Sequence, residues 1–326
     1  MSSSIAVPSF FNVFTNAGFN IIKHYYSEID KHAIACYKYN FKNSEYVGSV
    51  TTLDAGAITR PNIITFGSPC QDFSVAGKRA GMEGQRSSLI GQALRLIAES
   101  RPDIFIWENV KGVFSSNSGA DFWAIIQAFT DIGGYRLEWQ LLNTSWFLPQ
   151  NRERIYLVGY STTTSGRGVF PIAANGRKVT EPSINQIGTR LDSEGTQPYQ
   201  QDRVYDVDGI VPALCQGKSD LIVAMRGRYN EDGSTSQQLE LNTSGKSNTL
   251  TAVQKDNMVI NDYRIRRLTP IECERLQGFP DQHTAYGNYD GEVKPMSNSQ
   301  RYKQCGNAVT VDVVAAVAKK CLPLFN

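Results

Sequence analysis

The sequence has no long hydrophobic run. No stretch of its 326 residues approaches the ~18 consecutive apolar residues that cross a membrane. The first residues, Met-Ser-Ser-Ser-Ile-Ala-Val-Pro, contain neither the basic region nor the long apolar core of a secretory signal. This pattern argues against a membrane or secreted protein, and we expect a cytoplasmic location.

Cysteine and histidine are few and scattered. The six cysteines include no Cys-x-x-Cys pair, and the three histidines (positions 24, 32 and 283) form no cluster with them. Zinc sites and disulfide frameworks need such spacings, so the sequence argues against both. We expect a protein that holds no metal.

An excess of one charge sign is also lacking. Lysine and arginine number 33 and aspartate and glutamate 31, a formal net charge of +2. Whole-molecule charge therefore does not indicate a polyanionic partner, and any nucleic-acid surface must be local. The candidate basic patches are Lys78 and Arg79 with Arg86, Arg152 with Arg154, and the run at 264–267. Each is equally compatible with a solvated charged face.

What the sequence does contain is a regular alternation over residues 18–160. Short apolar segments alternate with amphipathic helical patterns, as in βαβ units. The expected strands are 21–26, 62–66, 104–107 and 155–158, and the expected helices are 30–40, 86–99 and 120–130. The pattern predicts an α/β fold with an open, doubly wound parallel sheet, whose ligands bind beyond the carboxyl ends of the strands.

Residues 161–262 differ in composition, because glycine, serine, threonine, asparagine and glutamine become frequent and the helical period fades. Two pieces, 211–223 and 248–260, resemble each other when one residue is gapped, and we interpret them as related β-hairpin-like units of a smaller, mostly β lobe. A long irregular insertion is the alternative. Helical patterns return afterwards and end in a helix at 311–320. The expected domains are 1–160, 161–262 and a return to the first domain over 263–326.

Chemically suggestive residues follow the expected strands. Cys70 comes after strand 62–66, where Gly67 frees the turn and Pro69 fixes the approach; a thiolate is favoured there if a helix begins nearby. A lone cysteine in such a place is more often inert. Glu108 ends another apolar strand and, half-buried, is suited to donating a proton near neutral pH.

Two arginines complete the set. Arg152 and Arg154 alternate on an extended segment, which places them on one face, suited to holding a phosphate or the carbonyl oxygen of a base. A nucleophilic thiol, a carboxylic acid and paired arginines suit addition to an electron-poor ring carried on a polyanion.

Five motifs occur in a fixed order: "GSPCQDFS", "ENVKG", "QNRERIYLVG", "RRLTPIECERLQGFPD" and "QCGNAV", with the variable lobe between the third and the fourth. In kind and order they resemble the motifs of the DNA (cytosine-5) methyltransferases of the bacterial and phage type. The resemblance runs nearly end to end. It implies a Rossmann-like, class I S-adenosylmethionine-dependent methyltransferase domain with a smaller, mostly β target-recognition domain at 161–262.

The resemblance also implies a mechanism. The enzyme flips a cytosine out of duplex DNA, because the ring carbon cannot be reached within the stack. Cys70 would add to C6, Glu108 would bind N3 and the exocyclic amine, and Arg154, helped by Arg152, would hold O2. C5 would then take a methyl group from S-adenosyl-L-methionine.

Further residues are assigned by the same resemblance. The residues expected to bind the cofactor are Ile5, Ala6, Glu28, Ile29, Val50, Pro69, Leu89, Asn307 and Val309. Those expected to bind DNA are Gln71, Ser74, Lys78, Arg79 and Arg86, within a loop at 73–89 that closes over the substrate. The implied partners are double-stranded DNA and a cognate restriction endonuclease that acts on the same site. We expect the enzyme to be monomeric and associated with the nucleoid.

The chain departs from the family in its cofactor half. It begins inside the first motif, so Ser4 stands at the place of a glycine and no strand precedes it, and Ser49 replaces an aspartate. We expect cofactor binding that is either weakened or completed by upstream residues. The alternatives are a tRNA cytosine-5 methyltransferase, a cofactor-impaired DNA-binding homologue and a subunit of a split enzyme. A Rossmann dehydrogenase is disfavoured because no Gly-x-Gly-x-x-Gly follows a strand.

Overall fold

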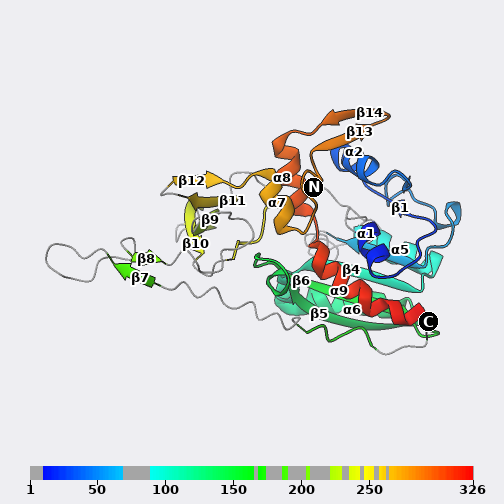
Figure 1. Cartoon of the computed structure of the whole chain (residues 1–326). Coiled ribbons are helices and arrows are strands. Elements are labelled where there is room, and N and C mark those ends of the chain that lie inside the picture. Colours follow the sequence, from blue (N-terminus) through cyan, green and yellow to red (C-terminus); the bar gives the residue numbers. More distant parts are fainter. Residues whose placement is uncertain are drawn as a thin grey trace.

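The computed structural model describes residues 10–68, 89–164, 168–173, 186–189, 203–205, 221–229, 235–242, 246–252, 257–261 and 264–325. A layered α/β part forms one body, and the strands β7 to β12 lie beside it (Figure 1).

A four-stranded sheet forms the centre of the α/β part. Its order is β3 (Ile63–Gly67), β4 (Ile104–Val110), β6 (Glu153–Ser161) and β5 (Tyr135–Asn143). Three of these strands match the predicted ones, whereas β5 was not predicted. β3 and β4 are parallel, but β6 runs antiparallel to both β4 and β5. The sheet is therefore mixed, because β5 and β6 are joined by a short connection that leaves no room for a crossover helix.

Helices cover both faces of this sheet. On β4, Ile104 and Ile106 face α1 (Phe10–Asn16) and α9 (Val311–Cys321). Phe105 and Trp107 point to the other face, towards α5 (Leu89–Ser100) and α6 (Ala120–Asp131). None of these four strand residues is more than 1% exposed. The alternation fixes the register of β4, since a one-residue slip would exchange the two faces.

Two short strands that precede the central sheet in the sequence form a separate parallel pair. β1 (Tyr25–Tyr26) and β2 (Glu45–Tyr46) are connected by α2 (Lys31–Asn40), whose N-cap Asp30 accepts hydrogen bonds from the amides of residues 32 and 33. Within the described ranges, this pair is not hydrogen-bonded to the four-stranded sheet. The strand predicted at 21–26 is shorter than expected, and Ile22 is 92% exposed. Ser4 lies outside the described residues.

The second group of strands is antiparallel throughout. β7 (Gln186–Thr189) pairs with β8 (Arg203–Tyr205), and a second sheet has the order β10 (Thr235–Asn242), β9 (Leu221–Tyr229), β11 (Asn257–Asn261), β12 (Arg264–Arg267). The two similar sequence pieces end in the strands β9 and β11, which pair with each other, Val223 opposite Met258. The hairpin partner of β9 is instead β10. The sheet continues through β12, past the boundary predicted at residue 262.

The chain then returns to the α/β part. α7 (Pro270–Leu276) begins with a capping box formed by Thr269 and Glu272. The hairpin of β13 (Tyr286–Tyr289) and β14 (Glu292–Pro295) contacts α2, and α8 (Asn298–Asn307) precedes α9. Short 3-10 turns are η1 (Ala55–Ala57), η2 (Lys111–Phe114), η3 (Ser116–Gly119), η4 (Thr144–Trp146) and η7 (Leu322–Phe325).

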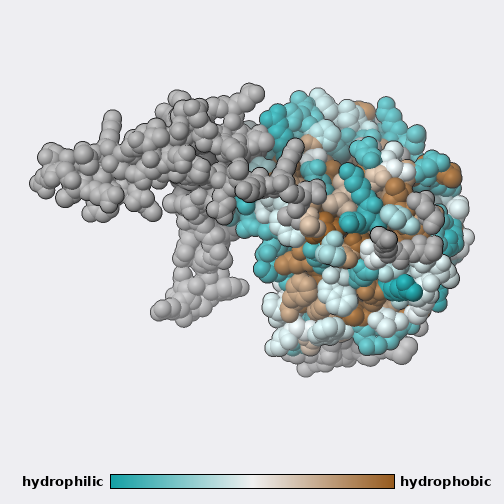
Figure 2. All heavy atoms as spheres, turned by 60° about the horizontal axis from the view of Figure 1, so that its bottom comes forward, coloured by the Kyte–Doolittle hydropathy of each residue, from teal (hydrophilic) through white to brown (hydrophobic). Residues whose placement is uncertain are grey.

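The surface of the α/β part mixes apolar and polar residues. On the face shown in Figure 2, apolar residues (brown) gather in the middle and polar residues (teal) lie around them. No helix in the described part of the chain is both long and apolar enough to span a membrane.

Candidate active site

Glu108 and Arg154 form an ion pair where β4 ends and β6 begins. The Nε of Arg154 lies 3.1 Å from Oε1 of Glu108, and the two side chains are only 16% and 15% exposed. The antiparallel register brings them together, because Val110 lies opposite Arg154 and Glu108 opposite Tyr156. The pair is therefore held at one edge of the sheet, with both charges largely shielded from water, which strengthens their attraction.

Gly67 gives the Glu108 carboxylate its space. The parallel register places Gly67, the last residue of β3, beside Glu108. A Cβ atom at position 67 would lie 3.1 Å from Oε2 of Glu108 and 3.5 Å from its carbonyl oxygen. A glycine at this position therefore allows the carboxylate to lie against the backbone of the neighbouring strand.

Two side chains of β4 fix the end of β3. The Nδ2 of Asn109 donates to the carbonyl oxygen of Ser68 at 3.0 Å and to its Oγ at 3.3 Å, and Nε1 of Trp107 donates to the same Oγ at 3.0 Å. Asn109 is 3% exposed, and its own Oδ1 accepts from the amide of Val110. Ser68 is thus held rigidly to β4, two residues before Cys70.

Cys70 itself lies outside the described residues, as do Pro69, Gln71, Ser74, Lys78, Arg79 and Arg86.

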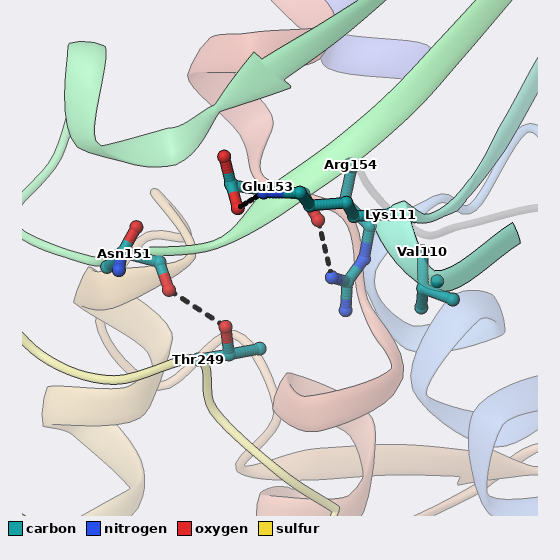
Figure 3. Close-up of a pocket in the computed structure, with 7 residues that line it drawn as sticks. Val110, Lys111, Asn151, Glu153, Arg154 and Thr249 are labelled. Atoms are coloured by element: carbon teal, nitrogen blue, oxygen red, sulfur yellow. Dashed lines mark hydrogen bonds and ion pairs between the residues drawn. The ribbon is translucent and has the colours of Figure 1, made fainter. Parts of the chain in front are cut away.

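A pocket of about 290 Å³ opens beside Arg154 (Figure 3). It is lined by Val110, Lys111, Gly112, Asn151, Glu153, Arg154 and Thr249. Three contacts brace its walls: Lys111 pairs with Glu153 at 2.8 Å, Nη1 of Arg154 donates to the carbonyl of Glu153, and Oγ1 of Thr249 donates to the carbonyl of Asn151. The pocket is thus built from the ends of two strands and from the segment that follows β10.

Sequence reasoning missed part of this wall. Lys111 and Asn151 lie within the motifs "ENVKG" and "QNRERIYLVG". The motifs point to this part of the chain but assign no role to these two residues. Thr249 carried no signal, because its contribution depends on the return of a distant segment to β6.

Arg152 does not share the surroundings of Arg154. Its guanidinium is buried, the residue being 3% exposed, and donates to the carbonyl oxygens of Leu250, Gly306 and Ala308 at 3.3, 3.2 and 2.7 Å. Burial, followed by repulsion from Arg154, lowers the pKa of Arg152 to about 9. The expectation that both arginines face one way assumed an extended strand, but β6 begins only at Glu153. These contacts favour a structural role over contact with the base.

Glu28 and Ile29 lie just after β1. Glu28 is 4% exposed, and its Oε1 accepts from the amides of Ile29 and Asp30 at 2.7 and 3.0 Å. Ile29 is 57% exposed. A carboxylate beside an exposed aliphatic side chain suits the vicinal hydroxyls and the flat base of a nucleoside, so this pair fits the adenosine half of the expected cofactor.

The other expected cofactor residues differ in exposure. Asn307 is exposed at the end of α8 and Leu89 is half-buried at the start of α5. Val50 and Val309 are 3% and 2% exposed, so their side chains belong to the interior and a ligand would reach them chiefly through their main chains. Ile5 and Ala6 lie outside the described residues.

The cysteines that the structure describes are not suited to nucleophilic chemistry. Cys36, Cys273, Cys305 and Cys321 are buried and free. Burial raises the pKa of the Cys36 and Cys321 thiols to about 12 and raises that of the other two well above the ordinary value. All four are protonated at neutral pH. Across the described ranges, no group of histidine, cysteine, aspartate and glutamate side chains could hold a metal ion.

Comparisons with known proteins agree on one family. The profile of the C-5 cytosine-specific DNA methylases matches residues 10–323. The type II methyltransferase M1.ScrFI of Lactococcus lactis subsp. cremoris is 31% identical over 310 residues, which cover 92% of this chain and 72% of that protein. The orphan methyltransferase M.SPRI of Bacillus phage SPR is 26% identical and is covered to 92% in both chains. A prophage-encoded DNA modification methyltransferase from E. coli shares the fold, with a TM-score of 0.59, 20% identity and coverage of 99% and 97%.

Proposed function

Because this chain belongs to the C-5 cytosine-specific DNA methylase family and methylates C5 of cytosine in DNA, we propose the roles of its individual residues in that reaction. The observation that carries the proposal is the Glu108–Arg154 pair beside the fixed end of β3. A partly buried carboxyl, a guanidinium and a nearby thiol are the groups that addition to a cytosine ring requires.

The thiolate of Cys70 forms a bond to C6 of a cytosine that has been turned out of the duplex. Negative charge develops on N3 and O2 as the ring loses its aromaticity. Glu108 gives a proton to N3 and accepts a hydrogen bond from the exocyclic amine, and Arg154 donates to O2, so the developing charge is stabilised where it forms. After the methyl group has been added at C5, the C5 proton leaves to a base, the electrons of that bond form the C5–C6 double bond again, and the C6–sulfur bond breaks.

S-adenosyl-L-methionine is the proposed methyl donor, and it supplies an electrophilic methyl group on a sulfonium sulfur. Glu28 and Ile29 would bind the ribose hydroxyls and the adenine ring, and Asn307 would contact the same molecule from the end of α8. The family resemblance places Ser49 where an aspartate usually binds the adenine, and in the structure the Ser49 hydroxyl is hydrogen-bonded to that of Thr51. We expect this substitution to weaken binding.

The remaining residue roles and partners also belong to the proposal. Gln71, Ser74, Lys78, Arg79 and Arg86 would bind the DNA, whose phosphates attract basic side chains, and β9 to β12 would read its sequence. We propose a monomer that acts on double-stranded DNA, and a cognate restriction endonuclease as its counterpart.

Bisulfite sequencing of DNA from cells that express the chain tests the proposal. We expect protected cytosines at one recurring sequence with the unaltered chain and none with Cys70→Ser. Methyl transfer to duplex DNA compared with transfer to tRNA separates the two substrate classes. Calorimetric titration with S-adenosyl-L-homocysteine tests the cofactor residues, because Glu28→Gln should weaken binding while a change at an exposed carboxylate such as Glu292→Gln should not.

A further inference from the structure

Three distant segments of the main chain meet at Arg152. Residues 149–151 lie against Ser247 as a parallel bridge, in which the amide of Asn151 donates to the carbonyl of Ser247 and the amide of Ser247 donates to that of Pro149, both at 2.8 Å. This bridge fastens the start of β6 to the segment 246–252. That segment lies between β10 and β11, so it is the part of the chain that leaves and re-enters the β9–β12 sheet.

The end of α8 packs directly on the same segment. A Cβ atom at Gly306 would lie 2.3 Å from the amide nitrogen of Ala252 and 2.4 Å from the carbonyl carbon of Thr251. No real side chain tolerates such contacts with backbone atoms. The absence of a side chain at Gly306 is therefore what allows α8 and the 246–252 segment to touch backbone to backbone.

The guanidinium of Arg152 crosses this junction. Nη1 donates to Leu250 in the 246–252 segment, and Nη2 donates to Gly306 and Ala308 on either side of Asn307. The charged groups that face it are Arg154 and Glu108. A buried cation needs hydrogen-bond acceptors, and without it the buried carbonyl oxygens of Leu250 and Ala308 and the partly buried one of Gly306 would lose this donor.

We propose that Arg152 is a positioning residue that couples the cofactor site to the DNA site. Its one guanidinium fixes the turn that carries Asn307 and the segment that carries Thr249, a pocket residue beside Arg154. A displacement of either segment therefore changes the hydrogen bonds of the other. This inference rests on the proposed roles of Arg154 and Asn307 and adds the group that sets their relative places.

The junction predicts thermodynamic coupling between two ligands. A ligand that orders the 306–308 turn also orders the 246–252 segment, so S-adenosyl-L-homocysteine should tighten the binding of duplex DNA. Arg152→Lys keeps a charge but replaces a planar fork with a single ammonium, which cannot satisfy three carbonyls in the same geometry. Arg152→Gln removes the charge as well.

The experiment measures the dissociation constant for a duplex that carries the site methylated by the unaltered enzyme, with and without S-adenosyl-L-homocysteine, in the full-length chain. Calorimetry gives the affinity for S-adenosyl-L-homocysteine alone. Arg101→Gln is the matched control, because Nη1 of Arg101 also donates to two main-chain carbonyls, those of Ile132 and Gly133, at the opposite end of the sheet. Thermal melting of each variant reports loss of stability separately.

We expect Arg152→Gln to weaken the affinity for S-adenosyl-L-homocysteine about tenfold and to abolish its effect on DNA affinity, as the loss of hydrogen bonds to a charged group implies. Arg152→Lys should restore part of both, and Arg101→Gln should change neither. If Arg152→Gln does not fold, Arg152→Lys decides, with reduced coupling as the expected result. Coupling unchanged in Arg152→Lys, or absent from the unaltered enzyme, would overturn the inference. Failure of the proposed residue roles can be told apart from failure of this inference. In the first case Arg154→Lys would remain fully active, regardless of the results for the Arg152 variants.

Discussion

Arg154 Nε lies 3.1 Å from Oε1 of Glu108, across the antiparallel pair of β4 and β6. Both side chains are about 15% exposed. A substrate can therefore reach the pair only through the small part of its surface that is open to solvent. The guanidinium keeps the carboxylate oriented before the substrate arrives. A flipped cytosine would find both groups already in place, which lowers the cost of reorganisation in the transition state.

Glu108→Gln should lower the rate of methyl transfer ~100-fold or more, because an amide cannot supply a proton to N3. Retention of DNA in a gel-shift assay should stay within about twofold, since the amide occupies the same volume. Glu99→Gln is the control, because Glu99 is an exposed residue of α5 that pairs with Arg95. A Glu108→Gln enzyme as active as the control would exclude a role for this carboxyl in the chemistry.

Arg154→Lys should lower kcat ~10-fold or more and leave the fold intact. Lysine keeps the charge but cannot bind both the carboxylate and a base oxygen in the geometry of a planar fork. Arg60→Lys serves as the control, because Arg60 pairs with Asp103 at the opposite end of the same sheet. Single-turnover methyl transfer measures the effect, and equal rates for the two variants would contradict the assignment of Arg154.

Asn109→Ala should destabilise the protein by about 1–3 kcal/mol, because the partly buried Ser68 atoms lose their amide donor. Methyl transfer should fall by at least about tenfold, since the proposed nucleophile, Cys70, follows Ser68 by two residues and a small misplacement is costly. Asn62→Ala changes an asparagine at the other end of β3, where it bonds the half-buried Asp103, and should affect activity little. Chemical denaturation and rate measurements on both variants check the prediction. It would be contradicted if Asn62→Ala slowed methyl transfer and Asn109→Ala did not.

His283 predicts a loss of stability in mild acid. Burial lowers its pKa to about 4 from 6.5, so between these values the unfolded chain binds a proton that the folded chain does not. The free energy of unfolding therefore falls as the pH drops from about 6.5 towards 4, by on the order of 3 kcal/mol for this residue. His24, whose pKa burial also lowers to about 4, acts in the same direction.

His283→Phe provides the test, because the ring of His283 stacks on Phe279 at 4.5 Å and phenylalanine keeps that contact without titrating. Urea unfolding at pH 7.5 and pH 4.5 should show a smaller difference in the variant. An unchanged difference would mean that other groups cause the pH dependence.

The sequence predicted that Glu108 and Arg154 lie close together, because strand ends are local features. Glu108 and Arg154 each follow or begin a short apolar run, and the ends of neighbouring strands must meet. It did not predict β5, nor that β6 runs antiparallel, because strand direction depends on the length of the connection and not on the pattern of either strand. The buried position of Arg152 was equally hidden, since its partners lie 98 to 156 residues away.

The central claim is that the sulfur of Cys70 becomes covalently bonded to C6 of the target base. The most direct measurement is mass spectrometry of the enzyme after incubation with a duplex that contains 5-fluorocytosine at the methylated position, together with S-adenosyl-L-methionine. Fluorine cannot leave C5 as a proton does, so the adduct should accumulate on the peptide that contains Cys70 and should be missing from Cys70→Ser. An adduct on any other cysteine, or methylation that persists in Cys70→Ser, would contradict the account.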